Sequence, residues 1–328
     1  MKAIVQDVYG SPAVLAYRDI GMPAVGPHEV LVRVHAAGLH VGDCFGVRGF
    51  PLPVRLFTGL LRPSPGVPGS DLAGHVEATG AMVTAFRTGD AVFGAGHGTC
   101  AEYATAPEAR LAHKPPSLTF EQAAAVPTSA LAALHGLRDA GRLQAGQRVL
   151  IIGASGGIGT FAVQIAKARG AEVTGVCSST NVALIRSLGA DQAIDYTRED
   201  FAHTARGYDL VFDNVENRSL SDCRKALTPN GTLILNSGTG ARGFHFWQRL
   251  VTPLLLSPFV GHTLRRYLST PNYADLVVLT ELIEAGALKA VLDRTFPLQK
   301  TPSALHYIEA GHARGKVVIS IDDLSASR

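Results

Sequence analysis

A glycine-rich turn in the middle of the chain has the residue types needed to bind a phosphate-containing cofactor. An apolar run, residues 149–153 (VLIIG), leads into residues 154–159 (ASGGIG), and a helical stretch follows. Glycine has no side chain, so a pyrophosphate can approach its backbone, and the N–H groups at the start of a helix point toward such an anion. The spacing is that of a GxGxxG pattern with alanine at its first position. We therefore predict that a dinucleotide contacts Gly153, Ala154, Ser155, Gly156, Gly157, Ile158 and Gly159.

The residues after the second expected strand indicate which dinucleotide binds. An NAD site usually places Asp or Glu there, where the carboxylate binds the ribose hydroxyls of the adenosine half. This chain instead has Cys177, Ser178, Ser179, Thr180 and Asn181. A carboxylate would repel a 2′-phosphate, whereas hydroxyl and amide groups would not. The pattern predicts NADPH over NADH, with Ser178 and Asn181 as contacts and Arg186 or Tyr196 as further partners.

Histidine and cysteine pairs offer a second chemistry, which is metal binding. His40 and Cys44 are four residues apart, and His97 and Cys100 are three apart. Such pairs in a β-rich region are more often packed or solvent-facing residues than zinc ligands, so we predict no metal site. The four cysteines show no CxxC spacing, which argues against a disulfide framework or a four-cysteine zinc lobe. A reducing, cytoplasmic compartment fits best.

Two kinds of sequence pattern must position these residues. Up to about Leu118, short alternating runs bounded by Gly, Pro or Asp predict a domain that is mostly β. One helical stretch over residues 121–141 follows, and then apolar strands alternate with helices, which predicts a parallel sheet covered on both faces. The expected strands cover residues 148–153, 172–177, 192–196, 208–215 and 231–238.

The last third of the chain begins with a segment that fits neither pattern. Residues 239–267 are apolar, broken by proline and flanked by arginine, and are either a packed surface hairpin or a cap over a ligand cleft. The tail predicts helix, strand, helix and strand over residues 274–286, 290–298, 303–315 and 316–322. We expect these elements to return to the first domain.

Composition excludes several other classes of protein. A length of 328 residues suggests about two domains, and 17% charged residues, 46% hydrophobic residues and 35 glycines are typical of a soluble α/β protein. The net charge of +3 is small and the basic residues are scattered, so neither nucleic acid nor an acidic membrane surface is the expected partner. The first ten residues predict a strand rather than a signal peptide, and the longest apolar run, residues 250–261, is too short to span a membrane.

Several stretches together resemble the medium-chain dehydrogenase/reductase superfamily, in its zinc-free quinone oxidoreductase and enoyl reductase-like branch. They run almost from end to end and include AAGLHVGD, GVPGSDLAGHVEATG, GDAVFG, AEYATAP, AAAVPTSAL, the glycine-rich region, LGADQAIDYTREDF, LIEAGALKAVLDRTFPL and GHARGKVVI. The resemblance implies an α/β protein with a GroES-like β domain plus a Rossmann domain with a doubly wound parallel sheet. We expect residues 1–124 and 268–328 to form the GroES-like catalytic domain and residues 125–267 the NADPH-binding domain. Relatives often dimerise, so a homodimer is implied.

The resemblance also implies a reaction. Zinc-dependent members bind a catalytic metal through three positions that correspond to His40, Ser70 and Thr128, and this set does not make a zinc site. The function implied is therefore an NADPH-dependent, zinc-independent reductase that transfers hydride to a quinone or an α,β-unsaturated carbonyl compound. One alternative is a zinc-independent carbonyl or alcohol oxidoreductase. Another is a non-catalytic NADPH-binding protein.

Individual site residues follow from the same resemblance. His40 replaces an asparagine of the family pattern, and either donates a hydrogen bond or proton to the developing oxyanion or packs at the cleft wall. Asp43 matches a family aspartate, and either transfers a proton or stabilises the turn. Further expected cofactor contacts are Val215, Ser237 and Lys316, although a surface role for the lysine is left open. The expected substrate pocket contains Phe45, Phe50, Thr128 and Phe246, with Phe57, Phe244 and Trp247 as further candidates and aromatic core packing as the alternative.

Overall fold

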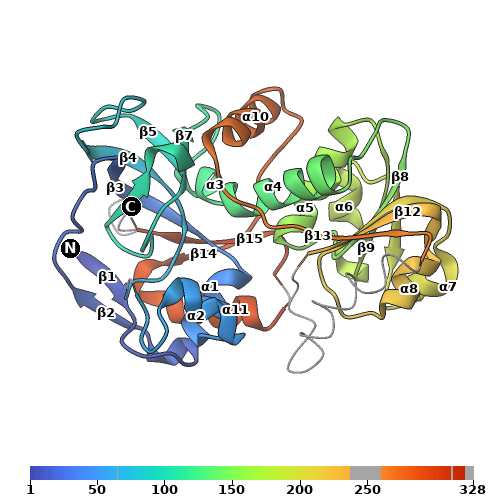
Figure 1. The fold of residues 1–328 in the computed structure, drawn as a ribbon, viewed down its shortest axis with the longest axis horizontal. Helices are drawn as coiled ribbons and strands as arrows, with labels where there is room; N and C mark the ends of the chain where they lie inside the picture. The colour runs from blue at the N-terminus through green and yellow to red at the C-terminus, as the bar shows by residue number, and fades with distance from the viewer. Residues whose placement is uncertain (65, 237–259, 312, 322–328) are drawn as a thin grey trace. The chain divides into compact units, whose positions relative to one another are not determined.

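The computed structural model describes residues 1–64, 66–236, 260–311 and 313–321. The chain forms two compact units: unit 1 contains Met1–Leu131 and Thr270–Arg328, and unit 2 contains Ala132–Ser269. Both ends of the chain therefore belong to unit 1 (Figure 1). The sequence placed the domain boundaries after residues 124 and 267, whereas the compact units meet after residues 131 and 269.

Unit 1 is built around a mostly antiparallel sheet, in which only β14 and β15 pair in parallel among the described strands and whose long central strand is β3 (Glu29–Leu39). The valines at positions 30, 32 and 34 are buried in the core, which suits the stiff, branched side chains that favour strands. The strand order is β14-β15-β3-β4-β5-β7, and β6 also pairs with β3. The other strands are β1 (Lys2–Val5), β2 (Ala16–Asp19), β4 (Asp71–Thr79), β5 (Ala91–Ala95), β6 (Tyr103–Pro107), β7 (Leu111–His113), β14 (Leu292–Pro297) and β15 (Lys316–Ser320). Because β15, β3 and β4 are neighbours in this sheet, residues 316, 40 and 71 lie at or next to adjacent strand ends.

Helices of unit 1 place the residues that follow β3. α1 (Val41–Arg48) begins directly after that strand and packs on α11 (Thr301–Glu309), with Cys44 and Leu305 in one buried cluster (Figure 1). The helical stretch expected over residues 121–141 is present but is interrupted at residues 125–126, because Pro127 lacks a backbone N–H and starts a new helix. The structure has α3 (Phe120–Ala124), α4 (Pro127–Leu134) and a π-helical turn at His135–Ala140. The remaining helices described in unit 1 are α2 (Arg55–Thr58) and α10 (Tyr273–Glu284).

Unit 2 contains the parallel sheet predicted from the alternation of strands and helices. Its strand order is β10-β9-β8-β11-β12-β13, and every described pairing within it is parallel. The strands are β8 (Arg148–Ile152), β9 (Glu172–Cys177), β10 (Gln192–Asp195), β11 (Tyr208–Asp213), β12 (Leu227–Leu235) and β13 (Thr263–Arg266). From β8 the chain adds β9 and β10 on one side, and it then crosses to add β11, β12 and β13 on the other side. The switch point of this doubly wound sheet therefore lies between β8 and β11.

Strand β13 was not predicted, because it lies at the end of the segment that fitted neither sequence pattern. It is an edge strand aligned with β12, with Leu235 opposite Arg266. Two arginines in a four-residue strand hide the apolar pattern by which strands are recognised. The rest of that segment up to residue 259 lies outside the described residues.

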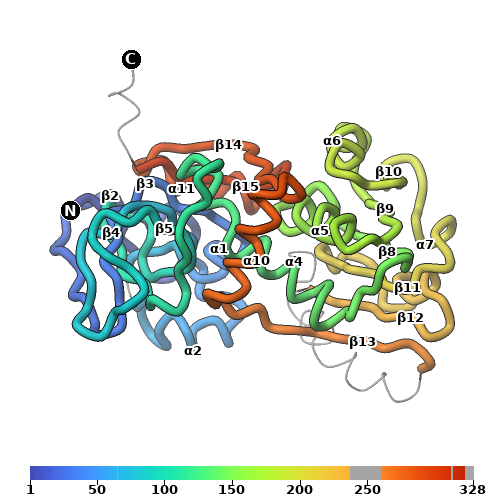
Figure 2. Tube along the Cα trace, turned by 90° about the horizontal axis from the view of Figure 1, so that it is seen from above, coloured from blue at the N-terminus to red at the C-terminus, as the bar shows by residue number. Residues whose placement is uncertain are grey.

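Helices cover the sheet of unit 2 on opposite sides. α5 (Gly157–Ala168) packs against β8 and β9, and α6 (Val182–Ser187) packs against β10. α7 (Phe201–Thr204) and α8 (Leu220–Lys225) contribute Phe201 and Cys223 to a buried cluster with the strand residues. Figure 2 shows α5 and α7 on different sides of the strands. Ligands of such sheets bind at the carboxyl ends of the strands. The loops after β8, β9 and β11 lie at these ends.

Candidate functional site

The glycine-rich turn after β8 has the geometry of a phosphate cradle. Gly153 has a φ of +75°, and Gly156 precedes the first residue of α5 as its N-cap. A Cβ on Gly159 would lie 2.1 Å from the carbonyl oxygen of Gly153, so a larger residue there would push the helix off the turn. α5 therefore begins close against the turn, and Gly156 and Gly157 at its start have no side chain that could block the approach of an anion to the N–H groups there.

Alanine at the first position of the pattern has a structural explanation. The left-handed conformation that the tight turn requires falls on Gly153, one residue earlier, so Ala154 needs no glycine-like backbone. Its N–H donates to the Val176 carbonyl oxygen at 3.0 Å, and its methyl group packs over Gly175 of β9, where an added Cβ would lie 2.9 Å away. The departure from GxGxxG thus leaves the cradle intact.

The loop after β11 borders this turn across the switch point. The backbone N–H of Asn214 donates to the Ile152 carbonyl oxygen at 3.2 Å, and a Cβ on Gly153 would lie 2.6 Å from Cγ2 of Val215. The side chain of Asn236, after β12, donates to Oδ1 of Asn214 at 3.0 Å. Val215 therefore lies beside the cradle, whereas Ser237 lies outside the described residues.

The end of β9 carries a hydrogen-bonded group of small polar side chains. Nδ2 of Asn181 donates to the hydroxyl oxygens of Ser155 and Ser178 at 3.1 and 3.2 Å. Asn181 is only 9% exposed, yet its Oδ1 has no hydrogen-bond partner among the described residues. A buried acceptor without a donor is costly and calls for a ligand group or water. The cradle and this orphaned oxygen both fit a dinucleotide, whose ribose hydroxyls are donors.

The acid that β9 lacks is present on the neighbouring strand. Asp195 at the end of β10 is aligned with Cys177, and its carboxylate accepts hydrogen bonds from the hydroxyls of Ser179 and Thr197. These hydrogen bonds hold the pKa of Asp195 below its usual range, so it is ionised at neutral pH. Sequence reasoning missed this acid because it considered only the strand that precedes the ribose site. Tyr196 and Arg186 are both exposed, and the backbone N–H of Tyr196 donates to the Cys177 carbonyl oxygen at 3.0 Å.

In unit 1, His40 lies between the end of β3 and the start of α1. Its ring Nε2 lies 2.9 Å from the hydroxyl oxygen of Ser70, the residue just before β4. The side chain is 22% exposed, and burial lowers the pKa of His40 to about 4, with a smaller opposing effect of Asp71. The imidazole is therefore neutral at neutral pH. It can donate one hydrogen bond through a ring N–H, but it holds no proton that it can release as an imidazolium.

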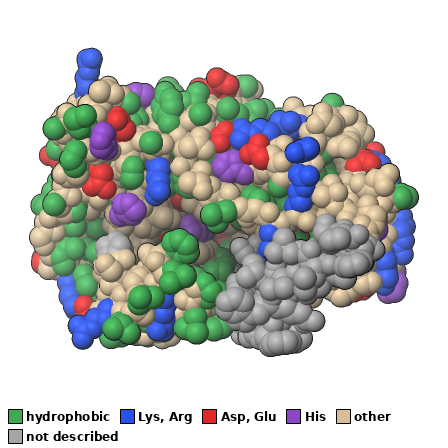
Figure 3. Space-filling model, viewed as in Figure 1, with side chains coloured by type: hydrophobic (Ala, Val, Ile, Leu, Met, Phe, Trp, Pro, Cys, Tyr) green, Lys and Arg blue, Asp and Glu red, His purple; other side chains and the backbone are tan. Residues whose placement is uncertain are grey.

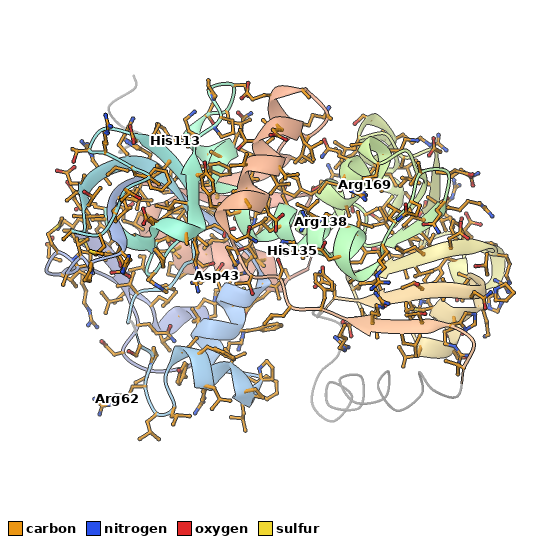
Figure 4. All side chains as sticks on the ribbon, turned by 45° about the horizontal axis from the view of Figure 1, so that its top comes forward. Asp43, Arg62, His113, His135, Arg138 and Arg169 are labelled. Atoms are coloured by element: carbon orange, nitrogen blue, oxygen red, sulfur yellow. The ribbon has the colours of Figure 1, made fainter. Side chains whose placement is uncertain are left out.

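Asp43 is the third residue of α1 and holds the start of that helix. Its Oδ2 accepts the backbone N–H of His40 at 2.8 Å and lies 3.6 Å from the His40 ring Nδ1. This is the capping-box arrangement, which satisfies an amide at the helix start. Burial raises the pKa of Asp43 to about 6. Figure 4 labels Asp43 beside α1.

A buried pair of opposite charges lies beside His40. Nζ of Lys316 is 3.8 Å from Oδ2 of Asp71 and donates to the Ser129 hydroxyl oxygen at 3.0 Å. The Thr128 hydroxyl donates to Oδ1 of Asp71 at 2.5 Å. Burial is the largest influence on both charged groups, and it raises the pKa of Asp71 and lowers that of Lys316.

Two residues that were predicted to contact cofactor or substrate have their polar groups bonded within unit 1 instead. Lys316, expected to contact the cofactor or the solvent, is 2% exposed and bonded within unit 1. Thr128, expected to contact substrate, has its hydroxyl engaged by Asp71. Asp71 and Ser129 were not predicted as site residues. The acid at position 71, directly after one of the three family zinc positions, was the available signal for them.

The predicted aromatic pocket is only partly described. Phe45 lies on α1 and is half-buried, while Phe50 and Phe57 are 50% and 87% exposed. Phe57 belongs to a run of exposed apolar side chains around α2, which Figure 3 shows as part of the hydrophobic surface. Phe244, Phe246 and Trp247 lie outside the described residues.

The histidine and cysteine pairs do not converge on a metal site. Cys44 and Cys100 are buried in one apolar cluster, and burial raises the pKa of both thiols, which disfavours the thiolate form that binds zinc. His97 is exposed. Within the described ranges, no group of three or more His, Cys, Asp or Glu side chains could hold a metal ion. The same residues contain no helix of the length and apolarity that crossing a bilayer requires.

Comparison with known protein families gives two matches. The alcohol dehydrogenase GroES-like domain matches residues 26–116, and the zinc-binding dehydrogenase domain matches residues 188–319. Together they account for most of the chain and for parts of both units.

Curated relatives align over nearly the whole length. The mitochondrial NAD(P)H oxidoreductase RTN4IP1 of Homo sapiens is 34% identical over 368 residues, which cover 98% of this chain and 89% of that protein. The 2-methylene-furan-3-one reductase of Solanum lycopersicum is 34% identical over 334 residues, with coverages of 97% and 79%.

Solved structures of similar proteins have the same fold as this chain. The quinone oxidoreductase from Coxiella burnetii has a TM-score of 0.85 and 30% identity, covering 98% of this chain and 99% of that one. The mycobacterial protein Rv1454c, solved in complex with NADPH, has a TM-score of 0.83 and 26% identity, with coverages of 98% and 100%.

Proposed function

This chain is an oxidoreductase that belongs to the medium-chain dehydrogenase/reductase superfamily, in its zinc-free quinone oxidoreductase and enoyl reductase-like branch, and from that premise we propose that it uses NADPH to reduce a quinone or an α,β-unsaturated carbonyl compound. The observation that carries the proposal is the phosphate cradle after β8 together with the orphaned Oδ1 of Asn181. The names of relatives support the substrate class, since one reduces a 2-methylene-furan-3-one and another is a quinone oxidoreductase.

Within this proposal, the residues of unit 2 hold the cofactor, which supplies hydride when bound. The N–H groups at the start of α5 bind the pyrophosphate. The Oδ1 of Asn181 accepts a ribose hydroxyl, and the hydroxyls after β9 meet the adenosine end. Tyr196 and Arg186, both exposed, are the proposed partners of the 2′-phosphate.

The residues of unit 1 stabilise the oxygen of the substrate. Reduction of an enone or quinone places negative charge on that oxygen, and a neutral donor in a partly buried position stabilises the charge. The hydrogen bond between His40 and Ser70 uses one of their donors, so either the hydroxyl O–H or the ring N–H remains for the substrate. Because the pKa of His40 is lowered to about 4, we assign it a hydrogen-bonding role rather than proton transfer, and water then protonates the product. Asp43 positions His40 through its backbone N–H.

The residues at the three family zinc positions support a reaction without zinc. They are His40, Ser70 and Thr128, and zinc prefers thiolate, imidazole and carboxylate ligands over hydroxyls. A reductase of electrophilic carbons needs no Lewis acid, whereas alcohol oxidation usually does. We therefore favour the reductase over the carbonyl or alcohol oxidoreductase.

The test measures cofactor and substrate in one experiment. Purified protein is titrated with NADPH and NADH by fluorescence, and oxidation of the bound nucleotide is then followed with quinones, enones and simple aldehydes. Tighter binding of NADPH and oxidation that depends on an enone or quinone support the proposal. Reversible alcohol oxidation without enone reduction would favour the alternative reaction, and tight binding without turnover would favour a non-catalytic role.

A cytoplasmic location is part of the proposal. The four cysteines are free and buried, which suits a reducing compartment. Fractionation of cells that express the chain, with detection by antibody, tests this location.

A further inference from the structure

Glu216, in the loop after β11, has an uncommon backbone for its residue type. Its φ is +55°, in the left-handed region that glycine adopts freely and other residues adopt at a cost in strain. The residue is 3% exposed, so its acid group is buried as well. Strained residues persist only where neighbouring contacts hold them, and they concentrate at sites of function.

Two sets of hydrogen bonds hold Glu216 in this conformation. Arg266, at the end of β13, donates from both terminal nitrogens to the two carboxylate oxygens at 3.0 and 2.6 Å. From the other side, Oδ1 of Asp213 accepts the backbone N–H groups of Val215 and Glu216 at 3.0 and 2.8 Å. The loop is therefore fixed through its side chain and through its backbone.

The ion pair spans one strand of the sheet. Asp213 is aligned with Leu235 of β12, and Leu235 is aligned with Arg266 of β13, so the three residues lie level at the carboxyl ends of adjacent strands. Arg266 reaches past the end of β12 to bind Glu216. The edge strand is thereby connected to the loop at the switch point.

That loop lies where the second half of a dinucleotide must pass. The pyrophosphate binds at the start of α5, and the adenosine half lies toward β9. The remaining half therefore extends to the opposite side of β8, over the ends of β11 and β12. Asn214 and Val215 border this region, because they contact Ile152 and Gly153 of the preceding strand and turn.

We propose that Glu216 is a positioning residue, which uses its ion pair with Arg266 to hold the Asn214–Val215 backbone in the orientation that receives the nicotinamide half of the cofactor. The inference rests on the proposed function of this site. Glycine would adopt this backbone without strain but would lose the ion pair, so the glutamate combines the left-handed turn with a bond to Arg266. The strained backbone is explained when the loop must be held in one orientation.

The test compares two substitutions that relieve the same kind of strain. Glu216→Gly removes the anchor from the switch-point loop. Arg142→Gly is its matched control, because Arg142 also has a positive φ, of 50°, and lies before the first residue of β8 rather than after the carboxyl end of a strand. We expect Glu216→Gly to raise the Kd for NADPH about tenfold and Arg142→Gly to leave it unchanged. A Kd for Glu216→Gly within twofold of the wild type overturns the inference.

A second measurement needs no cofactor. In the free protein, hydrogen exchange of the amides of residues 214–217 should become about tenfold faster in Glu216→Gly and stay unchanged in Arg142→Gly. If the wild type binds neither NADPH nor NADH, the proposed function fails, while this exchange still decides whether Glu216 holds the loop. Unchanged exchange would show that it does not.

A conservative variant separates positioning from folding. Glu216→Gln keeps the length of the side chain and one acceptor for Arg266, so its Kd for NADPH should lie between those of the wild type and Glu216→Gly. If Glu216→Gly does not fold, Glu216→Gln carries the test alone. If Glu216→Gln lowers the urea midpoint of unfolding but leaves the Kd for NADPH unchanged, the pair has a structural role and the inference is overturned.

Discussion

The ring Nε2 of His40 lies 2.9 Å from the hydroxyl oxygen of Ser70, and this contact joins two positions that hold zinc ligands in metal-dependent relatives. A histidine and a serine at this distance share one hydrogen bond, so the direction of that bond decides which group donates to a substrate. If Nε2 carries the proton, Ser70 donates outward from its own hydroxyl. If Nε2 accepts from Ser70, the imidazole donates from Nδ1, toward Asp43.

The first prediction separates the two donors. Ser70→Ala and His40→Ala should each lower kcat by a factor of about ten to one hundred, because each removes a donor or the partner that orients it. His97→Ala is the control, since that histidine is exposed in the same unit. The measurement is steady-state oxidation of NADPH with the best acceptor. Turnover within twofold of the wild type for both variants would remove this pair from the mechanism.

The second prediction concerns the pH dependence of stability. The pKa of Asp43 is 3.8 in the unfolded state and about 6 in the folded state. Between these two pH values the folded state holds more protons than the unfolded state, so its stability falls as pH rises. The pKa of His40 is 6.5 in the unfolded state and about 4 in the folded state. Between these two pH values the unfolded state holds more protons, so stability rises with pH. The two opposite slopes largely cancel in the wild type between about pH 4 and about pH 6.

Single substitutions should expose each slope. Asp43→Asn leaves the His40 effect, and the free energy of unfolding should rise by up to about 3 kcal/mol as pH increases from about 4 to about 6.5. His40→Gln leaves the Asp43 effect, and the free energy should fall over a similar range. Urea unfolding at several pH values measures both. Parallel pH profiles for the two variants would contradict the shifted pKa values.

The fold and the glycine-rich turn were predictable for one physical reason, which is local patterning. The alternation of apolar strands and helices encodes the sheet of unit 2, and the turn of residues 153–159 encodes the cradle through glycine spacing alone. Neither depends on residues distant in sequence.

The missed features all depend on contacts between distant segments. Asp195 lies beside the end of β9 because β10 pairs with β9, and Asp71 meets Lys316 because β4 and β15 both pair with β3. The lowered pKa of His40 arises from burial, which the sequence does not reveal. Strand β13 was missed because its two arginines interrupt the apolar pattern of a strand, and the partners that explain them, the Ala140 carbonyl oxygen for Arg265 and Glu216 for Arg266, are distant in sequence.

The third prediction concerns selectivity between the two nicotinamide cofactors. The carboxylate of Asp195 lies beside the end of β9 and opposes a 2′-phosphate, although the hydroxyls of Ser179 and Thr197 and the Thr197 N–H partly satisfy it. Asp195→Asn should therefore raise the ratio of kcat/KM for NADPH over NADH by about three- to tenfold, because it removes an exposed like charge. The increase should shrink at high salt. An unchanged ratio at low salt would place the 2′-phosphate away from this strand.

The last prediction decides what Lys316 does. Lys316→Met leaves the Asp71 carboxylate buried without its cation and should lower the free energy of unfolding by about 3–5 kcal/mol, whereas Lys2→Met, in an exposed pair with Asp19, should change it little. Adding Asp71→Asn to Lys316→Met removes the second charge and should restore most of the stability, since the amide still accepts from Thr128.

The double variant also separates two roles for the lysine, because fluorescence titration gives its Kd for NADPH once stability is restored. A lysine that neutralises Asp71 predicts a Kd close to that of the wild type, and this is the result we expect from a Nζ bonded to Ser129 and 2% exposed. A Kd that stays raised at least tenfold, in a variant as stable as the wild type, would instead mean that the ammonium group reaches the cofactor phosphates directly.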